Sequence, residues 1–185
     1  MRLCLAADTG RTGWVPYSVL DSSIDVSPGG EGQTAIYAQF KDRAGNRTLW
    51  VRDFVVYDTT APVTTISGAG SFPAALWPDS IRGTSQDNNC GVRDVMISIL
   101  RQDSTLYWSG QSWITVQTWI HAAGTQTWAC ALPNTMSPGT VIKIEAIATD
   151  KAGNRQKTGA VAVMSVAAEP PRAVFGASPL SGPSP

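Results

Sequence analysis

At 185 residues the chain is longer than one average domain and short for two, so its length allows one large domain or one complete module with fragments. Charged residues make up 15% of the chain, and the 14 basic and 14 acidic side chains cancel, so the net charge implies no electrostatic steering toward nucleic acid, anionic membranes or acidic substrates. The 17 glycines and 12 prolines, with many Thr, Ser and Val residues, are typical of short strands joined by tight turns. The composition therefore predicts an all-β fold.

Residues 1–60 contain three or four candidate strands. The alternation of Ala35, Tyr37 and Gln39 predicts a strand with one buried face. It runs into Asp42-Arg-Ala-Gly-Asn46, where an Asp that caps its own backbone and a Gly that tolerates positive φ predict a hairpin turn back into residues 49–57. Three or four strands are too few to cover both faces of a core, so we expect residues 1–60 to be an incomplete domain.

The same turn recurs farther along the chain. Asp150-Lys-Ala-Gly-Asn154 follows another alternating run and lies 108 residues after the first turn, which is about the length of one immunoglobulin-type sandwich. Between the two copies, Asp58-Thr-Thr-Ala-Pro62 predicts a short, stiff linker, because Pro62 fixes its own φ and favours an extended conformation of the residue before it. Two copies of one module are therefore expected.

Residues 61–168 contain enough strands for a complete sandwich. The expected strands are 63–66, 80–85, 92–100, 105–108, 114–120, 125–132, 141–149 and 158–166. Residues 169–185 are rich in Pro, Ser and Gly and predict an extended linker.

Several of these motifs resemble a known family. The run from Gly30 to Asn46, followed by Val55-Val-Tyr-Asp-Thr-Thr-Ala-Pro62, resembles the C-terminal half of bacterial Ig-like repeats found in tandem in large extracellular proteins. Gly83-Thr-Ser-Gln-Asp-Asn-Asn-Cys-Gly-Val92 is similar to the entry into the third strand of such repeats, and residues 171–185 resemble the start of a PKD-type module.

The resemblance implies an immunoglobulin-like β-sandwich, with one complete module at 61–168 preceded by a truncated one at 1–60. It implies a secreted or cell-surface protein with spacer, adhesive or glycan-proximal roles, and it supplies no catalytic residue. The N-terminal apolar run reaches Asp8 too soon for a signal peptide, so we expect the export signal upstream of this segment.

Enzymatic chemistry has little support in the sequence. His121 is the only histidine, its context Trp-Ile-His-Ala-Ala-Gly is that of a strand end or loop, and no Walker, G-x-S-x-G or H-E-x-x-H motif is present. We therefore expect a non-catalytic structural or interaction module whose partners are the adjacent domains of the same polypeptide, and a glycan or surface protein as a further partner. An accessory module of an extracellular enzyme is an open alternative.

A carbohydrate-binding module is the other alternative. The chain has seven tryptophans, and Tyr107, Trp108 and Trp113 flank a tight Ser-Gly turn from which exposed rings could stack on sugar faces. The competing interpretation is that Trp108 and Trp113 pair across the hairpin and cover the edge of the core.

The three cysteines, Cys4, Cys90 and Cys130, contain no C-x-x-C pair, which argues against a zinc or thioredoxin-type site. Cys90 and Cys130 both fall in the complete module, and an exported module lies in an oxidising compartment, so they are the candidate disulfide. A free buried thiol at each position is the alternative.

No metal site is assigned from the sequence. Calcium is the one cofactor left open, because turn and linker residues supply hard oxygen ligands: Asp42, Asp58, Asp87, Asn88, Asn89 and Asp150. Asp and Asn in turns commonly only cap the backbone.

Overall fold

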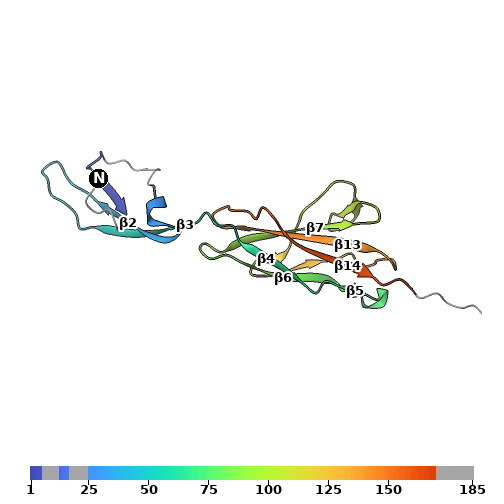
Figure 1. Cartoon of the computed structure of the whole chain (residues 1–185). Helices are drawn as coiled ribbons and strands as arrows, with labels where there is room; N and C mark the ends of the chain where they lie inside the picture. The colour runs from blue at the N-terminus through green and yellow to red at the C-terminus, as the bar shows by residue number, and fades with distance from the viewer. Residues whose placement is uncertain (6–12, 17–24, 170–185) are drawn as a thin grey trace, which may run out of the picture.

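The computed structural model describes residues 1–5, 13–16 and 25–169, and every structural statement below concerns these residues. The chain is all-β, with several antiparallel sheets and two short 3-10 helices, η2 (Ser27–Gly29) and η3 (Ala74–Leu76). A small N-terminal sheet and a larger unit follow one another along the chain direction, joined by the short segment between β3 and β4 (Figure 1). The predicted linker at 170–185 lies outside the described residues.

The N-terminal sheet has three antiparallel strands in the order β1-β2-β3: β1 (Arg2–Leu5), β2 (Gly32–Gln39) and β3 (Val51–Tyr57). The predicted alternating strand is β2, which pairs with β3 from Gly32↔Tyr57 to Ala38↔Val51.

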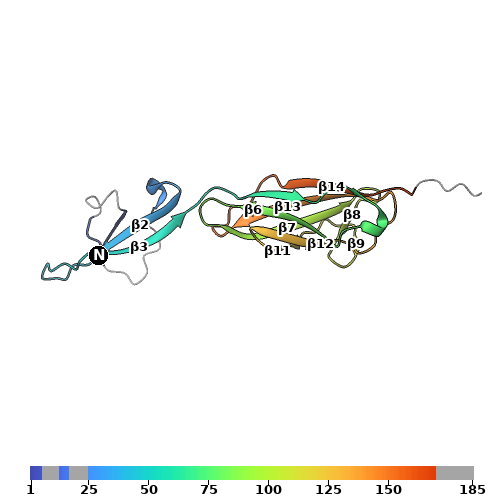
Figure 2. The ribbon, with the colours of Figure 1, turned by 90° about the horizontal axis from the view of Figure 1, so that it is seen from below.

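The larger unit is built from two sheets. One has the order β5-β14-β13-β7-β8-β9, with β10 also pairing with β7, and the other has the order β11-β12-β6-β4. The strands are β4 (Val63–Ser67), β5 (Ser71–Phe72), β6 (Ser80–Gln86), β7 (Val92–Arg101), β8 (Leu106–Trp108), β9 (Trp113–Ile114), β10 (Ile120–His121), β11 (Ala123–Gly124), β12 (Thr127–Ala131), β13 (Val141–Asp150) and β14 (Ala160–Val166). In Figure 1 β7 and β13 of the first sheet are drawn above β4 and β6 of the second, and in the turned view of Figure 2 the two sheets overlap, as stacked layers do.

The single strand predicted at 114–120 is wrong. β9 ends at Ile114 and β10 begins at Ile120, and Val116 between them is 70% exposed. The alternation of apolar residues there has no core face to occupy, so the pattern does not become a strand.

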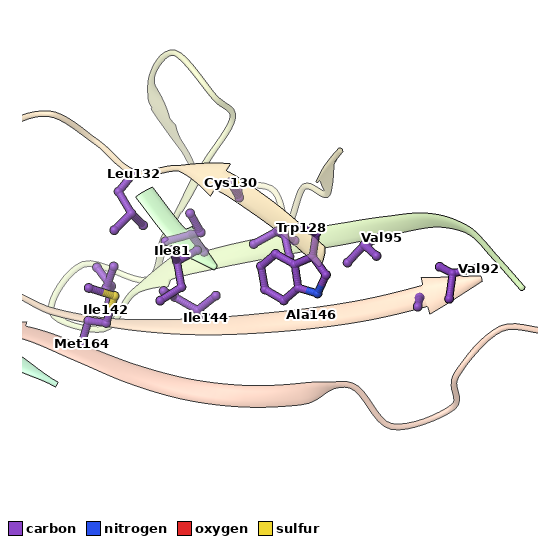
Figure 3. Packing of buried hydrophobic residues seen from close by; sticks show 13 residues of the cluster. Ile81, Val92, Val95, Trp128, Cys130, Leu132, Ile142, Ile144, Ala146 and Met164 are labelled. Carbon is purple, nitrogen blue, oxygen red and sulfur yellow. The ribbon is translucent and has the colours of Figure 1, made fainter. Parts of the chain in front are cut away.

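The core lies between the two sheets. Ile81 of β6 and Trp128 of β12 meet Ile144 and Ala146 of β13, and all four are essentially buried (Figure 3). The indole of Trp128 lies close to β6 because position 83 is a glycine: a Cβ there would overlap both the Trp128 ring and the Thr65 carbonyl. Burial of large apolar side chains between the layers is the main stabilising contribution to this unit.

The prediction for the two repeated turns is confirmed. Gly45 and Gly153 have φ values of 96° and 99°. In the first turn (residues 42–46), the Asp42 carboxylate accepts the backbone N–H of Asn46 at 2.8 Å and its side-chain amide at 2.7 Å. In the second turn (residues 150–154), Asp150 accepts the same two donors of Asn154, both at 2.8 Å. The two turns are therefore the same local structure.

Candidate functional site

The linker between the N-terminal sheet and the larger unit is fixed by Asp58, which is only 8% exposed. Its Oδ1 accepts the backbone N–H of Thr60 at 3.0 Å and the side-chain amide of Asn89 at 3.4 Å, and its Oδ2 accepts the N–H of Cys90 at 3.2 Å. Its carbonyl accepts the Asn154 side-chain amide at 2.9 Å. One residue of the linker thus binds the loop that precedes β7 and the second turn together.

The loop at residues 87–91 is organised by Asp87. Its Oδ2 accepts three successive backbone N–H groups, from Asn89 at 3.1 Å, Cys90 at 3.0 Å and Gly91 at 2.7 Å. Its Oδ1 is buried and has no hydrogen-bond partner among the described residues. An unpaired carboxylate oxygen away from water is costly, so this oxygen is the acceptor in the loop with free capacity.

Glu31 reaches the linker from the start of β2. Its Oε1 accepts the N–H of Thr59 at 3.0 Å and the Thr59 hydroxyl, and its Oε2 accepts the Thr60 hydroxyl at 2.6 Å. The amide of Asn89 donates to the same Oε2 at 3.3 Å, and so joins the N-terminal sheet directly to the larger unit. The hydrogen bonds from the Thr59 and Thr60 hydroxyls lower the pKa of Glu31.

A compact group of Asp58, Cys90 and Asp150 lies at the centre of this site, with one ligand atom of each within 4.8 Å of the others. Asp150 is completely buried, and its Oδ1 also accepts the N–H of Gly153 at 2.6 Å. A hydrogen bond from the Cys90 thiol lowers the pKa of Asp58, while burial and that same bond raise the pKa of Cys90. The thiol therefore stays protonated, and its hydrogen-bond geometry also makes it a donor to the Gly91 carbonyl at 3.8 Å.

We call this arrangement the junction: Glu31, the linker 58–62, the loop 87–91 and the second turn. Of the oxygen ligands considered from the sequence, Asp58, Asp87, Asn89 and Asp150 come together here. Asp42 lies instead in the first turn, and Asn88 is exposed. The carboxylates of Asp58, Asp87 and Asp150 are the groups that could hold a divalent cation, and Ca²⁺ prefers such oxygen ligands to a thiol.

The sequence did not predict the roles of Glu31 and Cys90. Glu31 lies within the run from Gly30 to Asn46, but no role was assigned to it there, and its position beside Thr59 and Thr60 follows only from the path of β2 and β3. Cys90 was considered only as half of a disulfide.

The disulfide predicted between Cys90 and Cys130 is absent from the structure, where both thiols are free. Cys130 pairs in register with Ile81, five residues before β6 ends at Gln86, and Cys90 lies beyond that end. Five residues of strand span roughly 16 Å, whereas a disulfide needs Cα atoms within about 7 Å. Cys4, left without a mate in the sequence, lies in β1 opposite Tyr37.

The three aromatic residues considered for glycan binding lie on the β8–β9 hairpin. Trp108 and Trp113 are directly paired across it, with ring centroids 5.4 Å apart and ring planes at 57°. Both indoles and Tyr107 are half-buried, and the two indoles pack against the core cluster. The tilted pair thus packs against the core edge while it remains partly exposed, and glycan binding by these three residues stays a prediction. His121 lies elsewhere, exposed on β10.

Comparisons with known proteins found similarity among solved structures and none by sequence. No family model matches the sequence, and no curated protein matches it. Among solved structures, the chain is similar to a Ca²⁺-stabilised adhesin with which an Antarctic bacterium reaches out and binds ice, at 13% identity and a TM-score of 0.34. That match covers 75% of this chain and 32% of the adhesin chain, so this chain spans about a third of its length. A match at this TM-score does not show a shared fold.

Over the ranges 1–5, 13–16 and 25–169, the structure contains no helix with the length and apolar character needed to cross a membrane.

Proposed function

We propose that this chain is a non-catalytic spacer or adhesion-type segment of a larger secreted or cell-surface protein, built from immunoglobulin-like modules in tandem. Its role in this proposal is to hold neighbouring domains at a fixed distance and direction. The observation that carries the proposal is the junction, where a carboxylate of the N-terminal sheet and a carboxylate of the linker share the Asn89 amide of the larger unit.

The junction has the features of a fixed connection. A flexible linker would leave its polar groups in water, but Asp58 is buried, and both its carboxylate and its carbonyl accept bonds from the larger unit. Pro62 restricts the backbone just before β4. Several charge-assisted hydrogen bonds in a partly buried setting hold geometry better than an exposed ion pair does.

The repeated turn supports the tandem assignment. Asp42 and Asp150 make the same hydrogen bonds at equivalent places after equivalent strands. Chains of similar sandwiches joined by short stiff linkers act as extended rods, because each contact orients the next unit.

Small-angle scattering of the full chain tests the spacer role. We expect one extended conformation for the unmodified chain, and a wider distribution of shapes for the Glu31→Gln and Asn89→Ala variants. Asp103→Asn, at the exposed tip between β7 and β8, is the matched control and should leave the scattering unchanged. Identical scattering from all four proteins, with flexible fits preferred throughout, would contradict a fixed junction.

The non-catalytic part of the proposal has its own test. The isolated chain should show no hydrolysis of glycan, peptide or ester substrates. A hydrolytic activity that is lost on replacing His121 or a single Asp would overturn it.

Calcium binding at the junction is the second candidate, and the buried unpaired Oδ1 of Asp87 is the observation that favours it. Asp58 shares the Cys90 N–H donor with Asp87, and the ligand atoms of Asp58 and Asp150 lie within 4.8 Å of each other. A bound Ca²⁺ would replace some of the hydrogen bonds that these carboxylates now accept from N–H groups. The ion would then hold the linker, the loop 87–91 and the second turn together. Thermal unfolding with millimolar CaCl₂ against EDTA should show a rise in Tm that disappears in Asp87→Asn; the same Tm in both buffers would exclude the ion.

A further inference from the structure

The N-terminal sheet repeats a block of the larger unit strand for strand. β1, β2 and β3 have the order and directions of β7, β13 and β14. The pairing registers agree: Leu5 lies opposite Ile36 as Ile99 lies opposite Ile144. Ala38 pairs with Val51 in the first block, and Ala146 pairs with Ala160 in the second. Figure 1 shows the two blocks on either side of the linker.

In the second block, one continuous segment, residues 58–94, provides three kinds of cover. Its strands β4 and β6 belong to the opposing sheet, on which the inner face of β13 packs. Its short strand β5 pairs in parallel with the outer edge of β14, Ser71 opposite Ser165. Its linker and loop close the second turn, where Lys151 N–H donates to the Gly91 carbonyl at 3.0 Å and Asn154 donates to Asp58.

This cover, together with Trp128 of β12, buries the inner face of the second block. Ile144, Ala146 and Met164 of the second block are completely buried. Their counterparts in the first block, Ile36, Ala38 and Val55, are only half-buried. Ile36, Ala38 and Val55 thus form an apolar stripe at the positions that core residues occupy in the larger unit. The stripe is less buried than those core residues.

The edge and turn of the first block are open as well. Among the described strands, β3 pairs with β2 alone, and Phe54 and Val56 on it are exposed. The first turn is exposed, and a hollow of about 370 Å³ lies beside it. Its lining is Phe40, Lys41, Asp42, Asn46, Arg47 and Thr48. An unpaired strand edge is a template for another strand.

The charges at the first turn indicate the kind of segment that fits. Arg43 stands where Lys151 stands in the second turn, and Lys151 lies against Gly91, in the loop that Asp87 organises. Lys41 and Arg47 add positive charge beside the hollow, each within 5.4 Å of the centroid of the Trp14 ring. A basic turn is complementary to an acidic loop such as that of Asp87, and electrostatic complementarity of this kind favours one partner over others.

We propose that the N-terminal sheet and its first turn form a docking surface for a polypeptide segment of the same kind as residues 58–94. The partner is a segment whose strands pack on the apolar stripe and whose short strand pairs with β3. Its acidic loop and its linker contact the first turn. The side-chain amide of Asn46 donates a hydrogen bond to a backbone carbonyl of that linker, as the Asn154 amide donates to the Asp58 carbonyl. This inference goes beyond the spacer role and does not depend on a fixed junction.

The register makes the test specific. Because Leu5 corresponds to Ile99, Met1 corresponds to Val95, so a second copy of residues 58–94 can be joined directly before Met1 of the full chain. The control is the same extension carrying Ile66→Asp and Ile81→Asp, which places charges at two positions that pack in the core of the larger unit.

Hydrogen–deuterium exchange of residues 32–57 is the readout, with residues 92–166 as the internal measure that the larger unit is folded. We expect the extension to slow exchange in β2, β3 and the first turn by at least about tenfold, and the doubly charged control to have no such effect. Unchanged exchange with the intact extension, or equal slowing with the control, would overturn the proposal. A dimer of the unextended chain that already protects residues 32–57 would overturn it too, because a second copy of the sheet would then be the occupant.

Discussion

Replacement of Asp150 by alanine tests how much of the junction depends on a buried carboxylate. Asp150 is fully buried at the end of β13 and accepts three hydrogen bonds, from the N–H groups of Gly153 and Asn154 and from the Asn154 amide. Without it the Asn154 amide also loses the anchor that orients it toward the Asp58 carbonyl.

The magnitude follows from those contacts. A hydrogen bond to a charged group contributes about 1.5 to 3 kcal/mol, and a buried donor left unpaired costs about 1 to 3 kcal/mol. Because Gly153 is exposed and can turn to water, the losses do not add fully, and we expect Asp150→Ala to lower the free energy of unfolding by about 2 to 4 kcal/mol. For a unit of this size each kcal/mol corresponds to roughly 4 °C in Tm.

Urea unfolding followed by tryptophan fluorescence measures this change, since most of the tryptophans lie in the larger unit. Asp103→Ala is the matched control, because Asp103 is an exposed carboxylate of the same unit that bonds only to Arg101 and Ser104. Asp150→Asn, which keeps one acceptor oxygen, should fall between the two. If Asp150→Ala is no more destabilising than Asp103→Ala, the carboxylate does not hold the second turn and the reasoning fails.

Three other predictions concern single groups. Gly83→Ala should destabilise the larger unit by several kcal/mol in the same urea assay because its Cβ would meet the Trp128 ring and a carbonyl, whereas Gly13→Ala, which has open space, should be neutral; equal effects would refute the close approach. The pKa values of Glu31 and Asp58 are lowered in the folded protein, so the unfolded state binds more protons in the acid range, and stability should be complete above about pH 5 and fall as the pH drops through 4. A stability curve flat from pH 6 to 3 would contradict this. Burial raises the pKa of Cys130 to about 11, so its thiol should resist iodoacetamide at pH 8 until the chain is unfolded, and rapid labelling of the native protein would disprove its burial.

The local parts of the fold could be predicted from the sequence. The D-x-A-G-N turns were predicted correctly because their geometry depends on neighbouring residues: an Asp that bonds to the backbone nearby and a Gly at positive φ. The all-β class followed from composition and from alternation in β2 and β13.

The junction could be predicted only in part. Asp58, Asp87 and Asp150 were each recognised as possible oxygen ligands, but single-residue turn chemistry does not say which turns meet in space. Their meeting depends on how β6, β13 and the linker end at the same side of the larger unit. Glu31 joins them only because β2 begins next to the end of β3.

The two errors have the same origin. The Cys90–Cys130 disulfide was inferred from membership of one module, but the register that places Cys130 opposite Ile81 separates the two thiols along the strands. The strand at 114–120 was inferred from alternation, but the local pattern does not reveal whether a core face lies beside it.

The fixed direction between the N-terminal sheet and the larger unit is the central claim, and residual dipolar couplings of the full chain measure it most directly. Couplings from β2 and β3 and couplings from β7, β13 and β14 should fit one common alignment tensor, with the relative orientation seen on either side of the segment between β3 and β4 in Figure 1. Two tensors of clearly different magnitude for the two sets of strands would mean that the units move independently, and would contradict the spacer proposal.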